Sequence, residues 1–333
     1  MKKRALVVAI CGDSDFGKKP YENVKKYNPK ILRETYAHLF LTGEQSNIKF
    51  IKTSYDWYNP KTNKFSKGWT YDENLGWAKL EKEFEADVIF DKMPDTKKIM
   101  QYRRIFARRK MLFNPYYIEK VCTDKYETYK IFRALSPRTF KIRNKTELKE
   151  YLNKIRTDKV VYKPTKGSSA RAIIICDKED LLGKVREINE EKILQEFVES
   201  HDNKRIRIHH GVFDLRVVLS QGKIIDSYIR ASKNKNILMS NTALGGKMIF
   251  IHKDQIPKKI IKDLNTIEKE FKHYKSRLYT ADFVIDKNNR VWLIELNDKP
   301  GIFLQKSSYA WKKRRDKIAV AIIKNMKVFK RRD

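Results

Sequence analysis

Short apolar runs alternate with helical patterns through the first 115 residues, and this alternation restricts the possible folds of the chain more than any other feature. Four runs are predicted strands, at residues 5–11, 48–52, 87–90 and 111–113. The stretches between them predict helices near residues 29–41, 75–85 and 95–109. Because strands separated by helices form βαβ units, residues 1–115 are expected to fold as a parallel α/β domain.

The pattern changes after residue 115. Helices are predicted near residues 123–135, 145–155, 178–188, 256–274 and 309–326. Strands are predicted at residues 138–142, 159–163, 170–176 and 192–198, followed by a strand-rich stretch and a hairpin at 278–296. At roughly 150 residues per domain, 333 residues suggest about two domains. We therefore expect domains at 1–115 and 116–333.

The chain is strongly basic, with 74 Lys and Arg against 41 Asp and Glu, a net charge of +33. Such a field attracts nucleic acid and other polyanions. Residues 1–120 hold 25 basic and 15 acidic side chains and the remainder hold 49 and 26, so both parts share the excess. The densest runs, at 103–110 and 312–315, fit helices with solvated basic faces. Weak, nonspecific polyanion binding is therefore the most that the charge predicts.

The sequence predicts no membrane span, because its longest apolar runs are far shorter than the roughly 20 residues that cross a bilayer. The basic start at residues 1–4 imitates a signal peptide, but polar residues 12–15 follow the apolar run without a small-residue cleavage site. We therefore expect a first buried strand and a cytoplasmic protein. The widely spaced cysteines are expected to be reduced core thiols: Cys11, Cys122 and Cys176.

An acidic hairpin at residues 279–298 is the most informative segment for function. Two strand-like runs flank an Asn pair at 288–289, which tolerates the positive φ of a two-residue turn. Counting outward from that turn places Asp282 opposite Glu295, and strand alternation puts Asn297 on the face of Glu295. Paired like charges repel unless a cation lies between them, and an all-oxygen set suits Mg²⁺ bound with phosphates. The segment predicts a metal site; two exposed edge carboxylates are the alternative.

Residues 160–171 contain a strand, Lys163, a loop of small residues and a second strand. Backbone N–H groups around the loop are suited to phosphate oxygens, and Lys163 adds a positive charge. The segment lacks the Gly-Lys-Ser/Thr ending of a P-loop, and a plain Gly-Ser hairpin is the alternative. A further strand, 193–198, runs into a polar bend. There the backbone is suited to an adenine edge, and either Glu199 or Asp202 to ribose hydroxyls.

In this order the elements resemble the ATP-grasp superfamily of carboxylate ligases. The segments that carry the resemblance are 123–125, 162–170, 195–198, 214–217 and 282 with 295–297. Within the superfamily the chain is most similar to the endospore coat-associated YheC/YheD-type proteins, over segments 88–94, 213–216, 228–230, 240–246 and 293–301. The resemblance extends over about residues 88–305.

The resemblance implies an α/β fold in which an N-terminal parallel domain precedes an ATP-grasp domain of two α+β subdomains. Residues 124–198 would form the smaller lid subdomain, and residues 199–326 the subdomain that binds metal and phosphate. ATP would be clamped between the two.

The resemblance also implies roles for individual residues. Lys125 and Lys163 would contact the α- and β-phosphates. The loop that closes over the γ-phosphate would contribute Lys166, Gly167, Ser168 and Ser169. The adenine and ribose contacts would come from Gln195, Glu196, Val198 and either Glu199 or Asp202. The ligands of Mg²⁺ or Mn²⁺ would be Asp282, Glu295 and Asn297. The catalytic residues would be Arg216, Arg230 and Asn241, with the arginines neutralising the transferring phosphoryl group.

The implied activity is ADP-forming ligation of a carboxylate to an amine through an acyl-phosphate, with amino acids or peptides as candidate substrates. Met239 stands where RimK-like peptide ligases have an Arg, so the sequence does not favour their glutamate specificity. Two alternatives remain: a catalytically silent, ATP-binding structural protein of the spore-coat type, and a polyanion- or nucleic-acid-binding protein.

Overall fold

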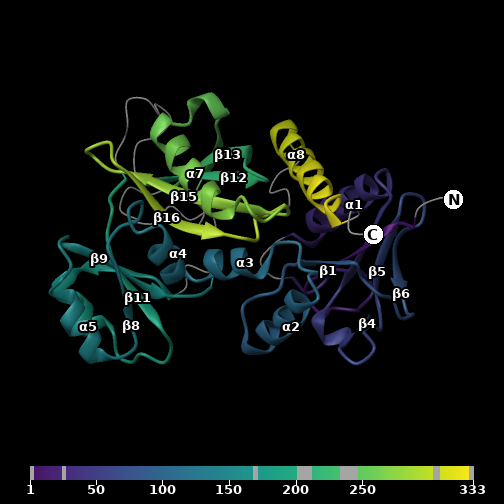
Figure 1. Cartoon of the computed structure of the whole chain (residues 1–333), viewed down its shortest axis with the longest axis horizontal. Helices are drawn as coiled ribbons and strands as arrows, with labels where there is room; N and C mark the ends of the chain where they lie inside the picture. Colours follow the sequence, from purple (N-terminus) through teal and green to yellow (C-terminus); the bar gives the residue numbers. More distant parts are fainter. Residues whose placement is uncertain are drawn as a thin grey trace. The chain divides into compact units, whose positions relative to one another are not determined.

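The computed structural model of the chain describes residues 4–24, 28–167, 172–200, 212–232, 247–302 and 308–329. It divides into two compact units (Figure 1). Unit 1 contains Met1–Tyr116, His273–Leu278 and Lys299–Asp333; unit 2 contains Tyr117–Lys272 and Tyr279–Asp298. The last helix thus belongs to unit 1, although the sequence placed it in the second domain. The domain limits of 1–115 and 116–333 stay a prediction.

Unit 1 is built on a five-stranded sheet with the order β6-β5-β2-β1-β7. Its parallel strands are β1 (Leu6–Cys11), β2 (Ile48–Thr53) and β7 (Val88–Asp91). Its antiparallel strands are β5 (Gly68–Asp72) and β6 (Gly76–Leu80), and a separate small hairpin pairs β3 (Tyr58–Asn59) with β4 (Lys64–Phe65). The three parallel strands are largely buried along their length, as expected where layers cover both faces of a sheet. The predicted N-terminal parallel sheet is confirmed.

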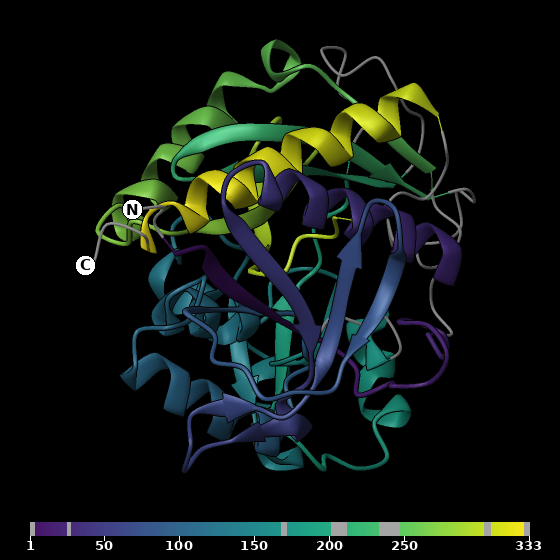
Figure 2. The ribbon, with the colours of Figure 1, turned by 90° about the vertical axis from the view of Figure 1, so that its right-hand side faces the viewer.

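The helices of unit 1 begin at residues suited to capping. α1 (Pro29–Glu44) starts after Asn28, whose side chain accepts hydrogen bonds from the N–H groups of Lys30 and Ile31. α2 (Lys97–Arg108) starts after Thr96, whose hydroxyl accepts a hydrogen bond from the Ile99 N–H. α8 (Tyr309–Met326) lies side by side with α1 (Figures 1 and 2).

Two expectations for unit 1 were wrong. The predicted helix at 75–85 is instead a hairpin arm, because Asp72 accepts hydrogen bonds from two following N–H groups and Gly76 adopts φ +76°, which turns the chain back along β5. The predicted strand at 111–113 contributes only an isolated parallel bridge between Leu112 and Ile89.

Unit 2 contains a four-stranded and a five-stranded sheet. The first has the order β10-β9-β11-β8 and comprises β8 (Thr139–Ile142), β9 (Lys159–Pro164), β10 (Ile174–Asp177) and β11 (Lys192–Glu196). The short helices of this unit are α3 (Tyr116–Thr123), α4 (Lys125–Ile131), α5 (Lys145–Leu152) and α6 (Leu181–Lys184). Leu148 and Leu152 of α5 share a buried core with Tyr162 and Leu194 of the sheet.

The second sheet of unit 2 has the order β14-β13-β12-β15-β16. Its strands are β12 (Phe213–Ser220), β13 (Lys223–Ala231), β14 (Lys247–Phe250), β15 (Leu278–Ile285) and β16 (Val291–Asn297). α7 (Lys258–Phe271) covers one face: the Phe271 ring lies 5.2 Å from the Tyr279 ring of β15, and the Tyr279 hydroxyl donates to Glu268 at 2.6 Å. By strand alternation, Thr280 and Asp282 face away from α7.

The β15–β16 hairpin has the predicted pairing of Asp282 with Glu295, but its turn differs from the predicted turn. The backbone of Asp286 pairs with that of Arg290, and Asn289 adopts φ +59°, so the predicted two-residue turn at 288–289 is wrong by one residue. A bulge then adds Ile294 to β16 between the pairs 283–293 and 282–295. The bulge restores the register, and Asp282 lies opposite Glu295 as predicted.

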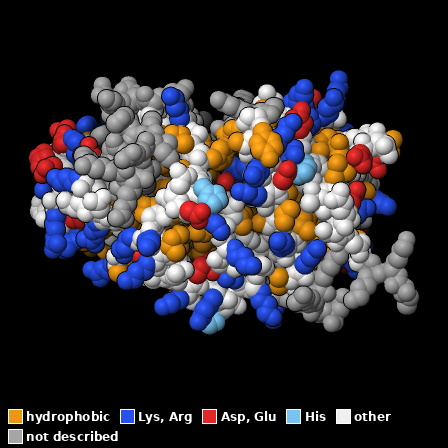
Figure 3. All heavy atoms as spheres, turned by 90° about the horizontal axis from the view of Figure 1, so that it is seen from above, with side chains coloured by type: hydrophobic (Ala, Val, Ile, Leu, Met, Phe, Trp, Pro, Cys, Tyr) orange, Lys and Arg blue, Asp and Glu red, His pale blue; other side chains and the backbone are white. Residues whose placement is uncertain are grey.

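No helix in the described ranges is long and apolar enough to span a bilayer. Cys11, Cys122 and Cys176 are buried with free thiols. On the face drawn in Figure 3, the coloured Lys and Arg side chains are scattered among hydrophobic and acidic ones.

Candidate functional site

Four neighbouring strands place polar side chains on the face of the second sheet that is turned away from α7. Residues directly paired in antiparallel strands point to the same face. The four pairs are Asp214 with Arg230, Arg216 with Tyr228, Thr280 with Asn297, and Asp282 with Glu295. Hydrogen bonds from Arg216 to Asp282 join the β12–β13 pairs to the β15–β16 pairs. We call these eight residues the polar face.

Asp282 is the centre of an ion network on the polar face. Arg216 donates to its two carboxylate oxygens at 2.6 and 2.5 Å, and Arg230 donates to Oδ2 at 2.7 Å. Arg230 also holds both oxygens of Asp214 at 2.7 and 2.8 Å. Burial acts to raise the pKa of Asp282, but Arg216 and Arg230 outweigh it and lower that pKa. Asp282 is therefore ionised, and Oδ1, with one donor, keeps a lone pair for another ligand.

Two lysines predicted to bind phosphate belong to the same unit. The Lys125 ammonium donates to the Gly167 carbonyl at 2.7 Å and lies 3.7 Å from Glu295 Oε1. Lys163 is buried and donates to Gln195 Oε1 at 3.1 Å. The pKa of Lys163 is lowered to about 8, mainly by burial. The Glu295 carboxylate acts to raise this pKa, and the Lys125 ammonium acts to lower it further. Lys163 thus carries its charge at neutral pH without a direct carboxylate partner among the described residues.

Local structure explains the placement of Lys125. Asp124 caps α4 by accepting hydrogen bonds from the N–H groups of Tyr126 and Glu127. The Lys125 N–H donates to the Thr165 carbonyl at 2.9 Å, which ties the start of α4 to the root of the loop after β9. Gly167 in that loop has φ +103°, a conformation that favours glycine.

The other predicted nucleotide-binding residues are less concentrated. The Glu196 carboxylate accepts the Arg156 N–H at 3.1 Å, so its side chain is already engaged away from Lys163. Val198 is half-buried, whereas Lys166 and Glu199 are exposed. Four predicted site residues lie outside the described residues: Ser168, Ser169, Asp202 and Asn241.

The oxygen donors of the polar face fit a hard divalent cation. Asp282 Oδ1 retains a lone pair, the Glu295 carboxylate forms one ion pair among the described residues, with Lys125 at 3.7 Å, and Asn297 lies on the same face. The described ranges contain no group of three or more His, Cys, Asp and Glu side chains placed to hold a metal. A cation here would therefore use two carboxylates, the Asn297 amide and oxygens of the bound nucleotide, as suits Mg²⁺.

Three members of the polar face were missed as site residues from the sequence: Asp214, Tyr228 and Thr280. Asp214 holds Arg230, and Thr280 lies opposite Asn297. The signal for all three was strand alternation, because each lies two residues before a predicted site residue: Asp214 before Arg216, Tyr228 before Arg230, and Thr280 before Asp282.

Unit 1 brings segment 88–94 together with residues 299–301, the end of another segment that carried the family resemblance. Lys299 donates to the Met93 carbonyl at 2.7 Å, and Lys92 donates to the Pro300 carbonyl at 3.1 Å. Arg103, 1% exposed, pairs with Asp91 at 2.5 Å. Every charge here has a partner, which indicates a structural role.

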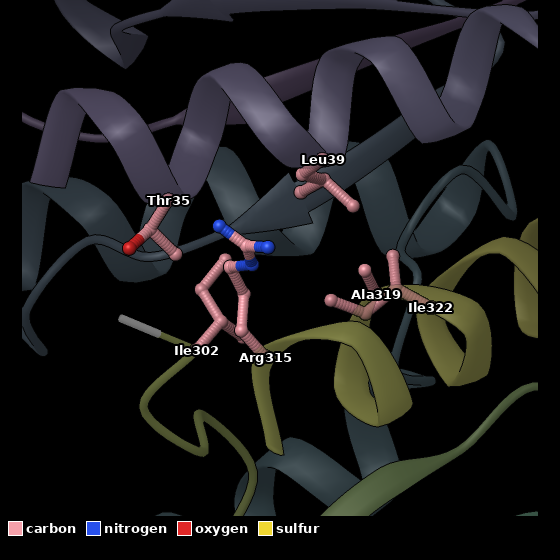
Figure 4. A pocket seen from close by; sticks show the side chains of 6 residues that line it. All are labelled: Thr35, Leu39, Ile302, Arg315, Ala319 and Ile322. Carbon is pink, nitrogen blue, oxygen red and sulfur yellow. The ribbon is translucent and has the colours of Figure 1, made fainter. Parts of the chain in front are cut away.

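A small pocket lies between α1 and α8 (Figure 4). Its lining residues are Thr35, Leu39, Ile302, Arg315, Ala319 and Ile322. The lining is mostly aliphatic, and Arg315 already pairs with Asp316 at 3.0 Å. The pocket therefore offers no second reactive site.

Comparison with protein families matches residues 109–324 to the family described as YheC/D like ATP-grasp. The match spans more than half of the chain, and the chain belongs to this family. No curated protein matched the sequence.

Solved structures of ATP-grasp ligases share the fold at low sequence identity. The VanG D-Ala:D-Ser ligase from Enterococcus faecalis is 12% identical with a TM-score of 0.62, over 98% of this chain and 99% of the ligase. The ADP complex of N5-carboxyaminoimidazole synthetase from Staphylococcus aureus is 11% identical with a TM-score of 0.60, over 96% and 78%. The macrocyclase MdnC from Microcystis aeruginosa, bound with precursor peptide MdnA, is 14% identical with a TM-score of 0.56, over 97% and 99%. These similarities confirm the ATP-grasp fold.

Proposed function

We propose that this protein is an ATP- and Mg²⁺-dependent ligase that joins a carboxylate to an amine and releases ADP and phosphate. The observation that carries the proposal is the polar face, where two arginines and three oxygen-donor side chains lie on neighbouring strands of the same sheet. Family membership and the fold shared with ligases support it.

The chemistry explains why these groups are needed together. A carboxylate resists attack by an amine until one of its oxygens is converted to a phosphate leaving group. In the proposed reaction a substrate carboxylate oxygen attacks the γ-phosphorus of ATP and ADP leaves. The amine then attacks the acyl carbon, phosphate leaves with the C–O bond electrons, and the amine loses a proton. Both steps develop negative charge on phosphoryl oxygens, which fixed cations stabilise.

Each group of residues has its own role in the proposed reaction. Lys125 and Lys163 bind the phosphates, and Arg216 and Arg230 stabilise the phosphoryl group in transfer. Asp214 and Asp282 hold the two guanidinium groups in position by the hydrogen bonds described above. Asp282, Glu295 and Asn297 would hold Mg²⁺, which would neutralise phosphate charge. The adenine and ribose contacts of Gln195, Glu196, Val198 and Glu199 or Asp202, and the catalytic role of Asn241, belong to the same proposal.

The candidate substrates are amino acids and peptides. We propose residues 124–198 as the lid, residues 199–326 as the subdomain that binds metal and phosphate, and the N-terminal domain as the source of part of the acceptor site. The cytoplasm, where ATP is available, is the proposed location.

The test is a screen of amino acids and acidic or basic peptides for substrate-stimulated ADP release. We expect at least one carboxylate–amine pair to raise ADP release in the wild-type protein and not in the Glu295→Gln variant. Tight, Mg²⁺-dependent ATP binding without turnover for any pair would instead favour a catalytically silent ATP-binding protein. Absence of ATP binding would contradict both.

A further inference from the structure

Thr280 carries a buried hydroxyl for which the described structure provides no hydrogen-bond partner. The residue is 1% exposed on β15, and its Oγ1 is inaccessible to solvent. A buried polar group without a partner costs roughly 1–3 kcal/mol. Such a group in a native fold calls for an explanation.

The position of Thr280 supplies one. It is directly paired with Asn297 of β16, on the face that also carries Asp282 and Glu295. The bulge in the hairpin lies beyond Asp282, so the two pairs 280–297 and 282–295 are in regular register. Directly paired residues have Cβ atoms about 5 Å apart, within reach of a hydrogen bond between a hydroxyl and an amide.

An amide side chain can bind a cation in one orientation only, whereas a carboxylate presents an oxygen in either orientation. Asn297 can bind a cation only through Oδ1, and its Nδ2 group, which donates two hydrogen bonds, must then face an acceptor. Groups that hold the ligands of a metal in this way contribute strongly to its affinity.

We infer that Thr280 is a positioning residue for Asn297: when a divalent cation is bound, Thr280 Oγ1 accepts a hydrogen bond from Asn297 Nδ2 and directs the amide oxygen to the cation. This inference rests on the proposed function, because it requires the metal site. Thr280 acts through Asn297 and touches neither substrate nor metal.

Other buried hydroxyls separate this reading from a purely structural one. Ser136, Ser276 and Tyr162 also have buried hydroxyl oxygens without a partner in the described residues. None of them belongs to the polar face. Ser276 provides the matched control, because Ser276→Ala removes a buried, unpartnered hydroxyl from a residue that is not part of the polar face.

The first experiment is calorimetric titration of Mn²⁺ into protein saturated with AMP-PNP, a non-hydrolysable ATP analogue. Thr280→Val keeps the shape of the side chain and removes the hydroxyl, so we expect Mn²⁺ affinity to fall about 10- to 100-fold. Thr280→Ser should retain most of the affinity, and Ser276→Ala should leave it unchanged. The midpoint of metal-free thermal unfolding should be equal or higher for Thr280→Val, since that variant loses no hydrogen bond.

The second experiment separates positioning of the amide from general packing. In Asn297→Asp the ligand is a carboxylate, which presents an oxygen in either orientation. Thr280→Val should therefore reduce Mn²⁺ affinity much less in the Asn297→Asp background than in the wild type. Equal losses in the two backgrounds, or an unchanged affinity of Thr280→Val in the wild type, would overturn the inference and leave the proposed ligase function intact. A wild-type protein that binds no Mn²⁺ with AMP-PNP would overturn both.

Discussion

Lys163 is buried with its pKa lowered to about 8, so its proton should respond both to unfolding and to a bound phosphate. Burial is the main cause, since it penalises the charged ammonium. In the unfolded chain the pKa returns to its ordinary value of 10.5. We therefore compare the wild-type protein with Lys163→Met, which fills a similar volume without a charge.

The magnitude follows from the two pKa values. Between pH 8 and pH 10.5 the unfolded wild-type chain holds the Lys163 proton and the folded protein does not, so folding stability rises with pH in that interval. Each unit of difference between the folded and unfolded pKa values corresponds to about 1.4 kcal/mol. Over this pH interval the free energy of unfolding of the wild type should therefore rise by roughly 3 kcal/mol relative to that of Lys163→Met. Loss of the hydrogen bond to Gln195 adds an offset of about 1 kcal/mol that does not change with pH.

The assay is urea unfolding of both proteins at pH 7, 8, 9 and 10. The difference between their free energies of unfolding should be constant below about pH 8 and should shift in favour of the wild type above it. A bound phosphate should restore the ammonium, so AMP-PNP binding at pH 8 should take up about half a proton in the wild type and none by this route in Lys163→Met. Proton uptake is measured by calorimetry in buffers of different ionisation enthalpy.

Two results would refute this reasoning. A stability difference that does not vary between pH 7 and 10 would mean that the folded pKa of Lys163 is not lowered. Equal proton uptake by both proteins would mean that Lys163 does not meet the phosphates.

Three further predictions concern the polar face and the charge. Glu295→Gln should abolish the Mg²⁺ dependence of ATP binding. Metal-free stability should stay unchanged, since Glu295 is partly exposed and lies 3.7 Å from its nearest cation. Equal ATP affinity of the wild type in EDTA and in Mg²⁺ would contradict the metal assignment. Asp282→Asn leaves Arg216 and Arg230 without their shared carboxylate. It should lower the free energy of unfolding, measured by urea titration, by about 3–5 kcal/mol. A loss below about 1 kcal/mol would show that the network is not buried as described. Duplex DNA should bind weakly and lose affinity steeply with added salt in anisotropy titrations; nanomolar binding near physiological salt would point to a nucleic-acid-linked function instead.

The parts of the fold that the sequence predicted are those with a local periodic signal. Alternating apolar runs identified the strands of the parallel sheet, and alternation also placed Asp282, Glu295 and Asn297 on one face. The turn that led to this pairing was wrong by one residue. The result survived because the extra residue at Ile294 compensates for the shift, and no propensity in the sequence signals such a bulge.

Sequence patterns could not predict contacts between segments that are far apart along the chain. Arg216 and Asp282 are 66 residues apart, and only the side-by-side order of β12 and β15 joins them. The predicted helix at 75–85 failed because the turn closed by Asp72 and Gly76 overrides a weak helical pattern. Ser168, Ser169, Asp202 and Asn241 lie outside the described residues, and their roles stay predictions.

Unit 1 is discontinuous along the chain, and this affects how the protein is made. The ribosome synthesises α8 only after all of unit 2, yet α8 packs against α1 within unit 1. Until then Leu39 of α1, which lines a pocket with Ala319 and Ile322 of α8, lacks part of its cover. Unit 1 therefore cannot complete its folding until the segment that follows Asp298, the last residue of unit 2, has been made. Long-range closure of this kind is slow, and it leaves apolar surface open to chaperones and to aggregation while the nascent chain is still growing.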